Sequence, residues 1–142
     1  MSSASTSGRG RSQPSAHSGE VRRGIRILIV DDEPEVLDML MAYFLASRHE
    51  VETAMTGTDA LIIVSQQRPD VVLLDVKMPG MNGIEALKGI MKLDPSIPVI
   101  IVTGTAELPV TVDAIRHGAF GYVPKPFDLR YLDHLIAASL GR

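Results

Sequence analysis

Three carboxylates stand at the ends of two strongly apolar runs of the chain. Asp31 and Asp32 follow residues 25–30, and Asp75 is the last residue of the run 71–75. A buried run has no structural need to end on a charge, because burying an unpaired carboxylate is costly. An aspartate in such a place can attack phosphorus and form an acyl phosphate. We therefore interpret Asp75 as a candidate phosphoryl acceptor.

The same acidic residues have the composition of a site for a hard cation. If the three aspartates converge, their like charges repel, and one of them takes up a proton unless a cation is present. None of the four histidines has metal-ligand spacing, and the chain has no cysteine. Oxygen ligands of this kind suit a hard divalent ion, and a site that receives phosphate suits Mg²⁺. We therefore expect Mg²⁺ here.

Two further polar residues stand beside later apolar runs. Thr103 ends the run 98–103, and Lys125 follows residues 120–123. Beside a metal ion, a hydroxyl and a mobile ammonium would share the charge on the oxygens of a transferring phosphoryl group. Taken alone, each has a simpler interpretation, as a strand-end cap and a solvated lysine. The functional interpretation therefore depends on whether they meet the aspartates.

Five predicted strands, of which the second is weaker than the apolar others, alternate with segments of helical periodicity. The predicted strands are 25–30, 50–54, 71–75, 98–103 and 120–123. Such alternation predicts an α/β fold, a parallel sheet with helices on both faces and ligands at the carboxyl ends of the strands. If the sheet is flavodoxin-like and doubly wound, with the strand order 2-1-3-4-5, the first and third strands are neighbours. All three carboxylates then meet in one cleft.

Residue types at the helix ends predict where the helices begin and stop. Thr58 is predicted to cap the second helix, and Asp128 the last. The fourth helix is predicted over 107–117, with Pro109 in its first turn. Gly118 then follows as a left-handed residue.

Composition indicates one domain preceded by a tail. Residues 1–24, with seven serines and four glycines, are predicted to be a disordered tail, and residues 25–142 a single domain. Four arginines against Glu20 give the tail a charge of +3, which leaves −6 for the domain because the net charge is −3. So acidic a domain is not expected to bind nucleic acid directly.

The same composition bears on compartment. Without cysteine the chain has neither disulfides nor thiolate metal sites. No apolar run approaches the roughly 20 residues that span a membrane. The N-terminus has no apolar secretory core. We therefore expect a cytoplasmic protein that does not contact membranes.

Four segments resemble the receiver domain of two-component response regulators. They are 29–34, 74–83, 102–104 and 122–127, and the resemblance covers residues 25–140. It implies that Asp75 is the phosphoacceptor. It also implies that Asp31 and Asp32 bind Mg²⁺ together with Asp75 and the backbone carbonyl of Lys77.

The resemblance further implies a switch. Lys125 pairs with the phosphoryl group, Thr103 hydrogen-bonds it, and Tyr122 turns inward once Thr103 is drawn to the phosphate. The Lys125–Pro126 bond is expected to be cis. The donor would be a histidine kinase, a phosphotransfer protein or a small phosphodonor. The fourth helix, fifth strand and fifth helix would present the changed surface to a partner, an output domain or a second copy in a phosphorylation-dependent dimer.

Other functions and contexts stay open. A haloacid-dehalogenase-type phosphatase also uses an aspartate nucleophile and Mg²⁺, but it needs a second aspartate where this chain has Lys77. A degenerate receiver would be a constitutive interaction module rather than a phosphoacceptor, yet every expected site residue is present. In the main interpretation the domain assists only its own phosphorylation and dephosphorylation. Residues 103–127 are also similar to receivers of the nitrogen-regulatory transcription-factor type, and both a stand-alone regulator and part of a longer protein fit.

Overall fold

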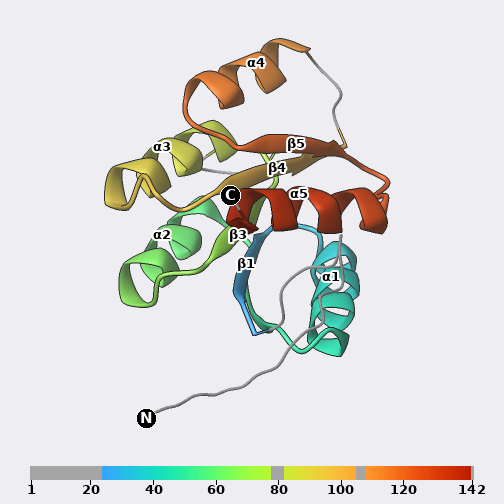
Figure 1. Ribbon diagram of the computed structural model, residues 1–142. Coiled ribbons are helices and arrows are strands. Elements are labelled where there is room, and N and C mark those ends of the chain that lie inside the picture. The colour runs from blue at the N-terminus through green and yellow to red at the C-terminus, as the bar shows by residue number, and fades with distance from the viewer. Residues whose placement is uncertain (1–23, 78–81, 105–107, 142) are drawn as a thin grey trace.

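The computed structural model describes residues 24–77, 82–104 and 108–141. Within these ranges five strands alternate with five helices. In chain order they are β1 (Arg26–Val30), α1 (Pro34–Ala46), β2 (Glu50–Ala54), α2 (Gly57–Gln66), β3 (Val71–Leu74), α3 (Gly83–Leu93), β4 (Val99–Thr103), α4 (Leu108–Arg116), β5 (Gly121–Pro124) and α5 (Leu129–Gly141). The strands are all parallel, in the order β2-β1-β3-β4-β5 (Figure 1). The predicted flavodoxin-like fold is therefore confirmed.

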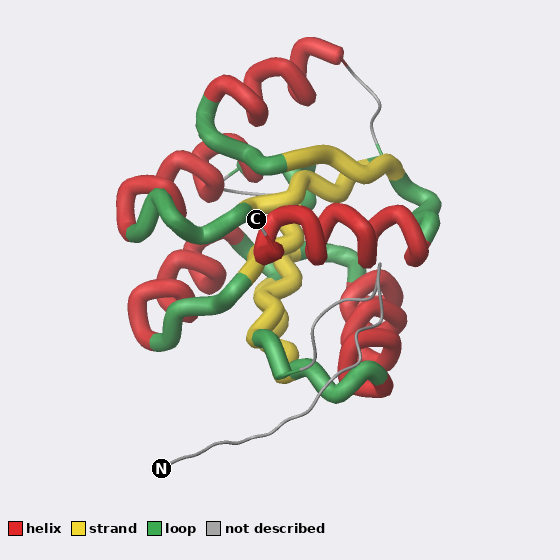
Figure 2. The backbone as a smooth tube through the Cα atoms, viewed as in Figure 1, coloured by secondary structure: helices red, strands yellow, loops and turns green. Residues whose placement is uncertain are grey.

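The helices cover the sheet in two layers. Figure 2 shows α2, α3 and α4 on one side of the strands and α1 and α5 on the other. Successive residues of a strand point to opposite faces. Leu28 and Val30 pack with buried residues of α2, α3 and α4, whereas Ile27 and Ile29 pack with those of α1 and α5. Because both faces are covered, the central strands are almost wholly apolar.

The helix ends confirm two predictions and correct a third. The side chain of Asp128 accepts hydrogen bonds from the first turn of α5, as predicted. Gly118 follows α4 with φ = +104°, in the left-handed region. The cap of α2, however, is Thr56, whose side chain accepts from the backbone N–H of Asp59 at 3.1 Å. The prediction of Thr58 was wrong because two threonines precede the same apolar positions, and Thr58 lies inside the first turn.

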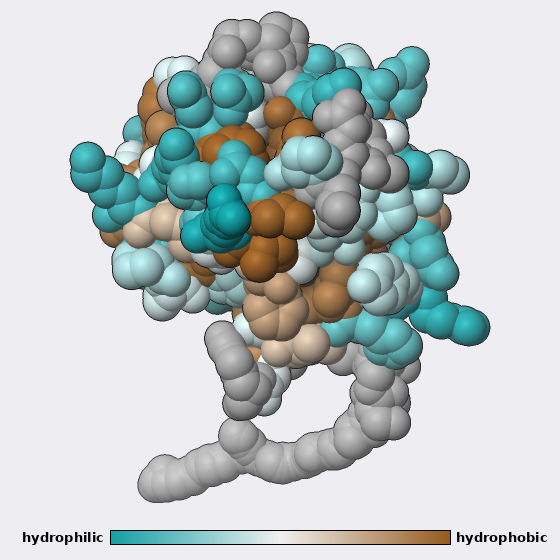
Figure 3. Space-filling view, turned by 90° about the horizontal axis from the view of Figure 1, so that it is seen from above, coloured by the Kyte–Doolittle hydropathy of each residue, from teal (hydrophilic) through white to brown (hydrophobic). Residues whose placement is uncertain are grey.

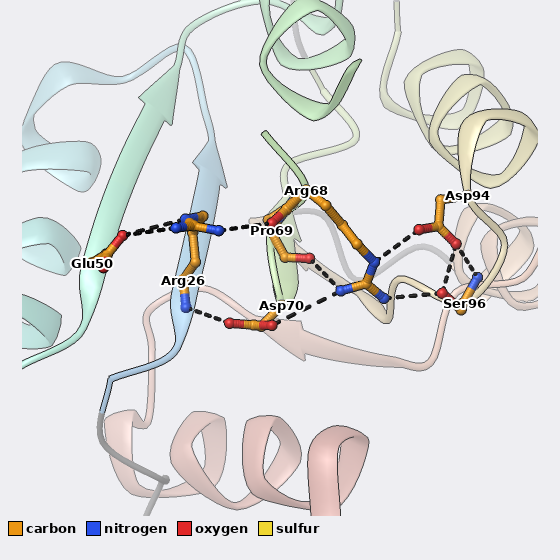
Figure 4. A network of polar contacts seen from close by, with 7 residues as sticks. All are labelled: Arg26, Glu50, Arg68, Pro69, Asp70, Asp94 and Ser96. Atoms are coloured by element: carbon orange, nitrogen blue, oxygen red, sulfur yellow. Dashed lines mark hydrogen bonds and ion pairs between the residues drawn. The ribbon is translucent and has the colours of Figure 1, made fainter. Parts of the chain in front are cut away.

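A polar network ties together the amino ends of the strands (Figure 4). The Arg68 guanidinium, between α2 and β3, donates to Asp94 at 2.8 Å and to Ser96 at 3.0 Å, both just before β4. The backbone N–H that begins β1, at Arg26, donates to Asp70 at 2.7 Å. None of the predicted site residues belongs to this network, so the two edges of the sheet are chemically distinct.

The predicted tail, residues 1–24, lies outside the described residues except for Gly24. Among the residues that are described, no helix combines the length and the apolar character needed to cross a membrane.

Candidate functional site

Asp31, Asp32 and Asp75 lie at the carboxyl ends of two neighbouring strands. β1 pairs with β3 so that Val30 stands opposite Leu74. The backbone N–H of Asp75 extends this pairing, donating to the Val30 carbonyl at 2.9 Å. The carboxylates that follow both strands therefore meet at the same edge. One carboxylate oxygen from each aspartate lies within 4.8 Å of the others.

Two of these carboxylates are almost completely buried. Asp31 is 2% exposed and Asp75 is 4% exposed. Burial raises the pKa of Asp75 above its usual range. The backbone N–H of Lys77, which donates to Asp75 Oδ1 at 3.0 Å, acts against that increase, while the charge of Asp31 adds to it. The buried Asp75 carboxylate thus needs nearby positive charge to stay ionised.

Lys125 supplies that charge at the centre of the cluster. Its Nζ lies 2.7 Å from Asp31, 3.0 Å from Glu33 and 3.3 Å from Asp75. Burial alone would lower the pKa of Lys125, but its hydrogen bonds to Asp31 and Glu33 and the charge of Asp75 raise it above its ordinary value. Lys125 follows β5 and precedes a cis bond to Pro126, as predicted. Lys125 therefore comes from the end of β5, and its ammonium contacts carboxylates at the ends of β1 and β3.

Glu33 was not predicted as part of this site. It occupies the N-cap position of α1, where its side chain makes no capping hydrogen bond. Instead its carboxylate contacts Lys125. Short side chains are preferred at N-caps, so a glutamate in that position, directly after an acidic pair, was the available signal.

Three other predicted residues are placed less fully. Thr103 ends β4, where its backbone pairs with Pro124, but its side chain lies outside the described structure. Tyr122 on β5 is partly buried and packs against the α2–α4 side of the core. Lys77 is exposed beside Asp75. The switch roles of Thr103 and Tyr122, and the ligand role of the Lys77 carbonyl, stay predictions.

Gly83 lets α3 begin directly against the acceptor strand. Its N–H donates to the Val76 carbonyl at 3.0 Å. A Cβ at this position would lie 2.2 Å from Val76 Cα and 2.6 Å from the Asp75 carbonyl oxygen. Since neither is the end of a flexible side chain, only glycine fits here. The close approach holds the Asp75–Val76 backbone in place.

The donor set fits a hard divalent cation. All three candidate ligands are carboxylates, two of them buried. Among the described side chains, the one cation within 4 Å of Asp31 or Asp75 is Lys125. One ammonium among Asp31, Asp75, Asp32 and Glu33 leaves the cluster negative, and a second, oxygen-preferring cation would reduce that repulsion.

Comparison with known proteins connects this arrangement to phosphoryl chemistry. A family model described as the response regulator receiver domain matches residues 27–137. The chain is 45% identical over 115 residues to the regulatory protein AtoC of Escherichia coli. This alignment covers 81% of the chain and 25% of AtoC. It is 42% identical over 104 residues to sporulation initiation phosphotransferase F of Bacillus subtilis, covering 73% of the chain and 84% of that protein. The chain thus spans about a quarter of AtoC but most of the phosphotransferase.

A solved structure extends the similarity to three dimensions. The CheX–CheY–BeF₃–Mg²⁺ complex of Borrelia burgdorferi contains a chain that matches with a TM-score of 0.77 and 28% identity. The match covers 82% of this chain and 89% of that chain. That complex holds a beryllofluoride group and Mg²⁺.

Proposed function

This chain belongs to the response regulator receiver domain family, and from this membership we propose that Asp75 is the phosphoacceptor of a phosphorylation-dependent signalling switch. The observation that carries the assignment is the Lys125 ammonium, 3.3 Å from the buried Asp75 carboxylate and 2.7 Å from Asp31. A paired, buried carboxylate at a strand end is placed for attack on a phosphoryl group, and the cation beside it keeps it ionised.

The transfer step exchanges one bond to phosphorus for another. An Asp75 oxygen attacks phosphorus and forms an acyl phosphate, while the bond from phosphorus to the donor breaks. The leaving group keeps the electron pair of that bond; it is imidazole for a phosphohistidine donor and acetate for acetyl phosphate. Lys125 then pairs with a phosphoryl oxygen, and Thr103 donates its hydroxyl to another. The domain assists only its own phosphorylation and dephosphorylation.

Mg²⁺ is the proposed cofactor. Asp31, Asp32 and Asp75 would hold it together with the backbone carbonyl of Lys77. When bound, the ion neutralises part of the charge on the phosphoryl oxygens. The oxygen-only donor set and the excess of negative charge around Lys125 support this assignment.

The proposed output surface is formed by α4, β5 and α5. Figure 3 views the molecule from the α4 side and shows apolar surface among polar residues. The exposed apolar side chains of α4 and of the residue before β5 are Val112, Ile115 and Phe120. Phosphorylation would change this surface through Thr103 and Tyr122. The proposed partners are a histidine kinase or phosphotransfer protein upstream, and a protein, an output domain or a second copy downstream.

The cellular setting is also a proposal. Two-component phosphotransfer between a kinase and this domain would take place in the cytoplasm. The match covers only 25% of AtoC, which supports a longer protein with an output domain. It covers 84% of the phosphotransferase, which supports a stand-alone form.

Neither alternative function has support. A haloacid-dehalogenase-type phosphatase needs a second aspartate two residues after the nucleophile, and Lys77 stands there. A degenerate receiver would lack part of the acidic cluster or the lysine, and both are present. The residues therefore favour a working phosphoacceptor.

Phosphorylation of purified variants tests the assignment. Wild-type protein incubated with acetyl phosphate and Mg²⁺ is expected to gain the mass of one phosphoryl group, and chelation of Mg²⁺ to prevent the gain. Asp75→Asn should gain nothing, whereas Asp38→Asn, at an exposed position of α1, should behave as wild type. Equal phosphorylation of Asp75→Asn would overturn the acceptor assignment.

A further inference from the structure

An apolar groove lies between α2 and α3, which are neighbours on one side of the sheet (Figure 1). Its volume is about 380 Å³, and it is lined by Thr58, Leu61, Ile62, Ser65, Gly89, Lys92 and Leu93. Because Gly89 has no side chain, Leu61 can lie directly against α3 and form the floor of the groove. Ile62 and Leu93, on its two sides, are 48% and 51% exposed. Large apolar side chains are therefore left in water on this face.

Two opposite charges flank the middle of the groove on α3. Glu85 and Lys92 are about two turns apart, so both project from the same side of the helix, and Gly89 lies between them. Both side chains are exposed. Among the described residues, no ion pair occupies either of them. The order along α3 is thus negative, uncharged, positive, which is complementary to the same order reversed.

α2 has the same kind of symmetry without charge. Leu61 and Ile62 lie at the centre of its groove side. Thr58 and Ser65, one turn away in either direction, add a hydroxyl at each end. α2 and α3 each connect two parallel strands, so they run in the same direction. The pair of helices therefore presents an apolar centre between polar ends.

Charge decides between two ways of bringing two such grooves together as a four-helix bundle. In one, a two-fold axis runs along the helices and α3 faces α2 of the other copy. Since the groove side of α2 has no charged residue, Glu85 and Lys92 then stay unpaired. In the other, the axis crosses the helices and α3 lies antiparallel to α3 of the other copy. Glu85 of each copy then lies opposite Lys92 of the other, which gives two ion pairs.

We infer that the α2–α3 groove is a surface for association with a second copy of this chain, in the antiparallel arrangement. Leu61, Ile62 and Leu93 of both copies form the core of the contact, and the two Glu85–Lys92 pairs lie at its rim. The contact uses neither Asp75 nor the α4–β5–α5 surface, so it does not depend on phosphorylation. A few apolar side chains and exposed ion pairs make a weak dimer, with a Kd of roughly 10–100 µM.

Sedimentation equilibrium of the whole chain, with a chelator and no phosphodonor, tests this inference. Wild type should change from monomer to dimer between roughly 5 and 500 µM. Glu85→Lys places like charges opposite each other twice, so it should raise the Kd of the dimer at least about fivefold, and Lys92→Glu should do the same. The variant with both substitutions restores opposite charges and should have a Kd within about twofold of wild type. Lys88→Glu, on the α4 side of α3, is the matched control and should dimerise as wild type.

The double variant separates pairing between copies from damage within α3. If the single substitutions only weakened the helix, the double variant would associate less than either, and that result overturns the inference. Wild type that stays monomeric over the whole range also overturns it and leaves the groove to a different protein.

Leu93→Lys separates this contact from the one proposed for α4, β5 and α5. The variant places a charge in the groove, so it should stay monomeric without beryllofluoride. It should still gain the beryllofluoride-dependent association, because that surface is unchanged. A Leu93→Lys protein that dimerises as wild type without beryllofluoride would contradict the inferred surface.

Discussion

At the residue scale, the acceptor site balances opposing electrostatic effects on Asp75. Burial and the charge of Asp31 raise the pKa of Asp75, whereas the Lys77 N–H and Lys125 lower it, and the net direction is upward. An acid whose pKa is higher in the folded state binds protons more readily there, so its ionised form is unfavourable for folding. The reactive charge of Asp75 therefore reduces stability.

Replacing Asp75 by asparagine should consequently stabilise the protein while it abolishes phosphorylation. Without divalent ions at pH 7, we expect the free energy of unfolding of Asp75→Asn to exceed that of wild type by about 0.5–2 kcal/mol. The gain should shrink as the pH falls towards 4, because Asp75 then takes up a proton in the folded state, where its pKa is raised. Urea unfolding in the presence of a chelator measures this, with Asp38→Asn as control. A less stable Asp75→Asn protein at pH 7 would contradict the argument.

A second buried titratable residue, His49, lies away from the site. It is 4% exposed, and within the described structure neither ring nitrogen has a hydrogen-bond partner. Its ring lies beside Phe44, with centroids 6.2 Å apart. Burial lowers the pKa of His49, and the charge of Asp133 only partly opposes this. Asp133 is itself engaged as acceptor of the Tyr43 hydroxyl.

The buried histidine predicts that the protein loses stability in mild acid. Below about pH 6.5, the ordinary pKa of histidine, the unfolded chain binds a proton at His49 that the folded chain resists. By pH 5.5 this should lower the free energy of unfolding by up to about 1.4 kcal/mol. Urea unfolding at pH 7.5 and 5.5 should show a smaller loss for His49→Phe than for wild type. The exposed control His134→Gln should lose as much as wild type, and identical losses in all three would refute the prediction.

At the element scale, the start of α3 is the tightest constraint on the acceptor strand. A Cβ at Gly83 would lie only 2.2 Å from the Cα of Val76, which is rigid backbone. Gly89, farther along the same helix, would instead meet Leu61 Cδ2 at 2.7 Å, the end of a flexible side chain. A side chain at Gly83 would therefore clash with backbone, whereas one at Gly89 would only require Leu61 to adjust.

Alanine at these two positions should have very different effects. Gly83→Ala is expected to lower the free energy of unfolding by about 2–3 kcal/mol, because the backbone of α3 or β3 must move. Gly89→Ala should stay within about 1 kcal/mol of wild type, since the gain in helix propensity offsets a shift of Leu61. Chemical denaturation of both variants measures the difference. Equal effects would show that α3 can adjust without cost.

The elements themselves were largely predictable from the apolar pattern. Strands buried on both faces are continuous apolar runs, so 71–75 was placed to within one residue. The weaker, partly exposed strand 50–54 was placed at its observed bounds. Contacts that depend on side-chain reach were not predictable. Glu33 bends towards Lys125, 92 positions away in sequence, and His49 is buried by elements that only the folded chain brings together. Thr56 and Thr58 are both suitable N-cap residues, and only the backbone shows that α2 begins at Gly57, so that Thr56 is the cap.

At the scale of the whole molecule, structural and chemical tasks occupy opposite edges of the sheet. The Arg68 network joins the amino ends of the strands, and the carboxylates and Lys125 meet at the carboxyl ends. The proposed α4–β5–α5 surface adjoins the second edge through β5, the strand that leads into Lys125. A change at the site can thus reach a partner through a short part of the fold.

Charge on this surface should block association without affecting phosphorylation. Ile115 on α4 is 47% exposed. We expect Ile115→Lys to weaken a beryllofluoride-dependent dimer at least about fivefold, with an unchanged rate of phosphorylation by acetyl phosphate. The matched control is Leu93→Lys, 51% exposed at the end of α3. Analytical ultracentrifugation compares the two. Equal weakening by both would contradict the assignment of this surface, and no dimer in wild type would remove a second copy from its proposed partners.

The central claim, that Asp75 carries the phosphoryl group, can be tested by chemical trapping. Borohydride reduces an aspartyl phosphate to homoserine, which peptide mass spectrometry locates to a single position. After treatment with acetyl phosphate and Mg²⁺, homoserine should be found at position 75, and it should be absent when Mg²⁺ is chelated. Homoserine at another aspartate, or a phosphoryl group that resists borohydride and persists in Asp75→Asn, would contradict the account.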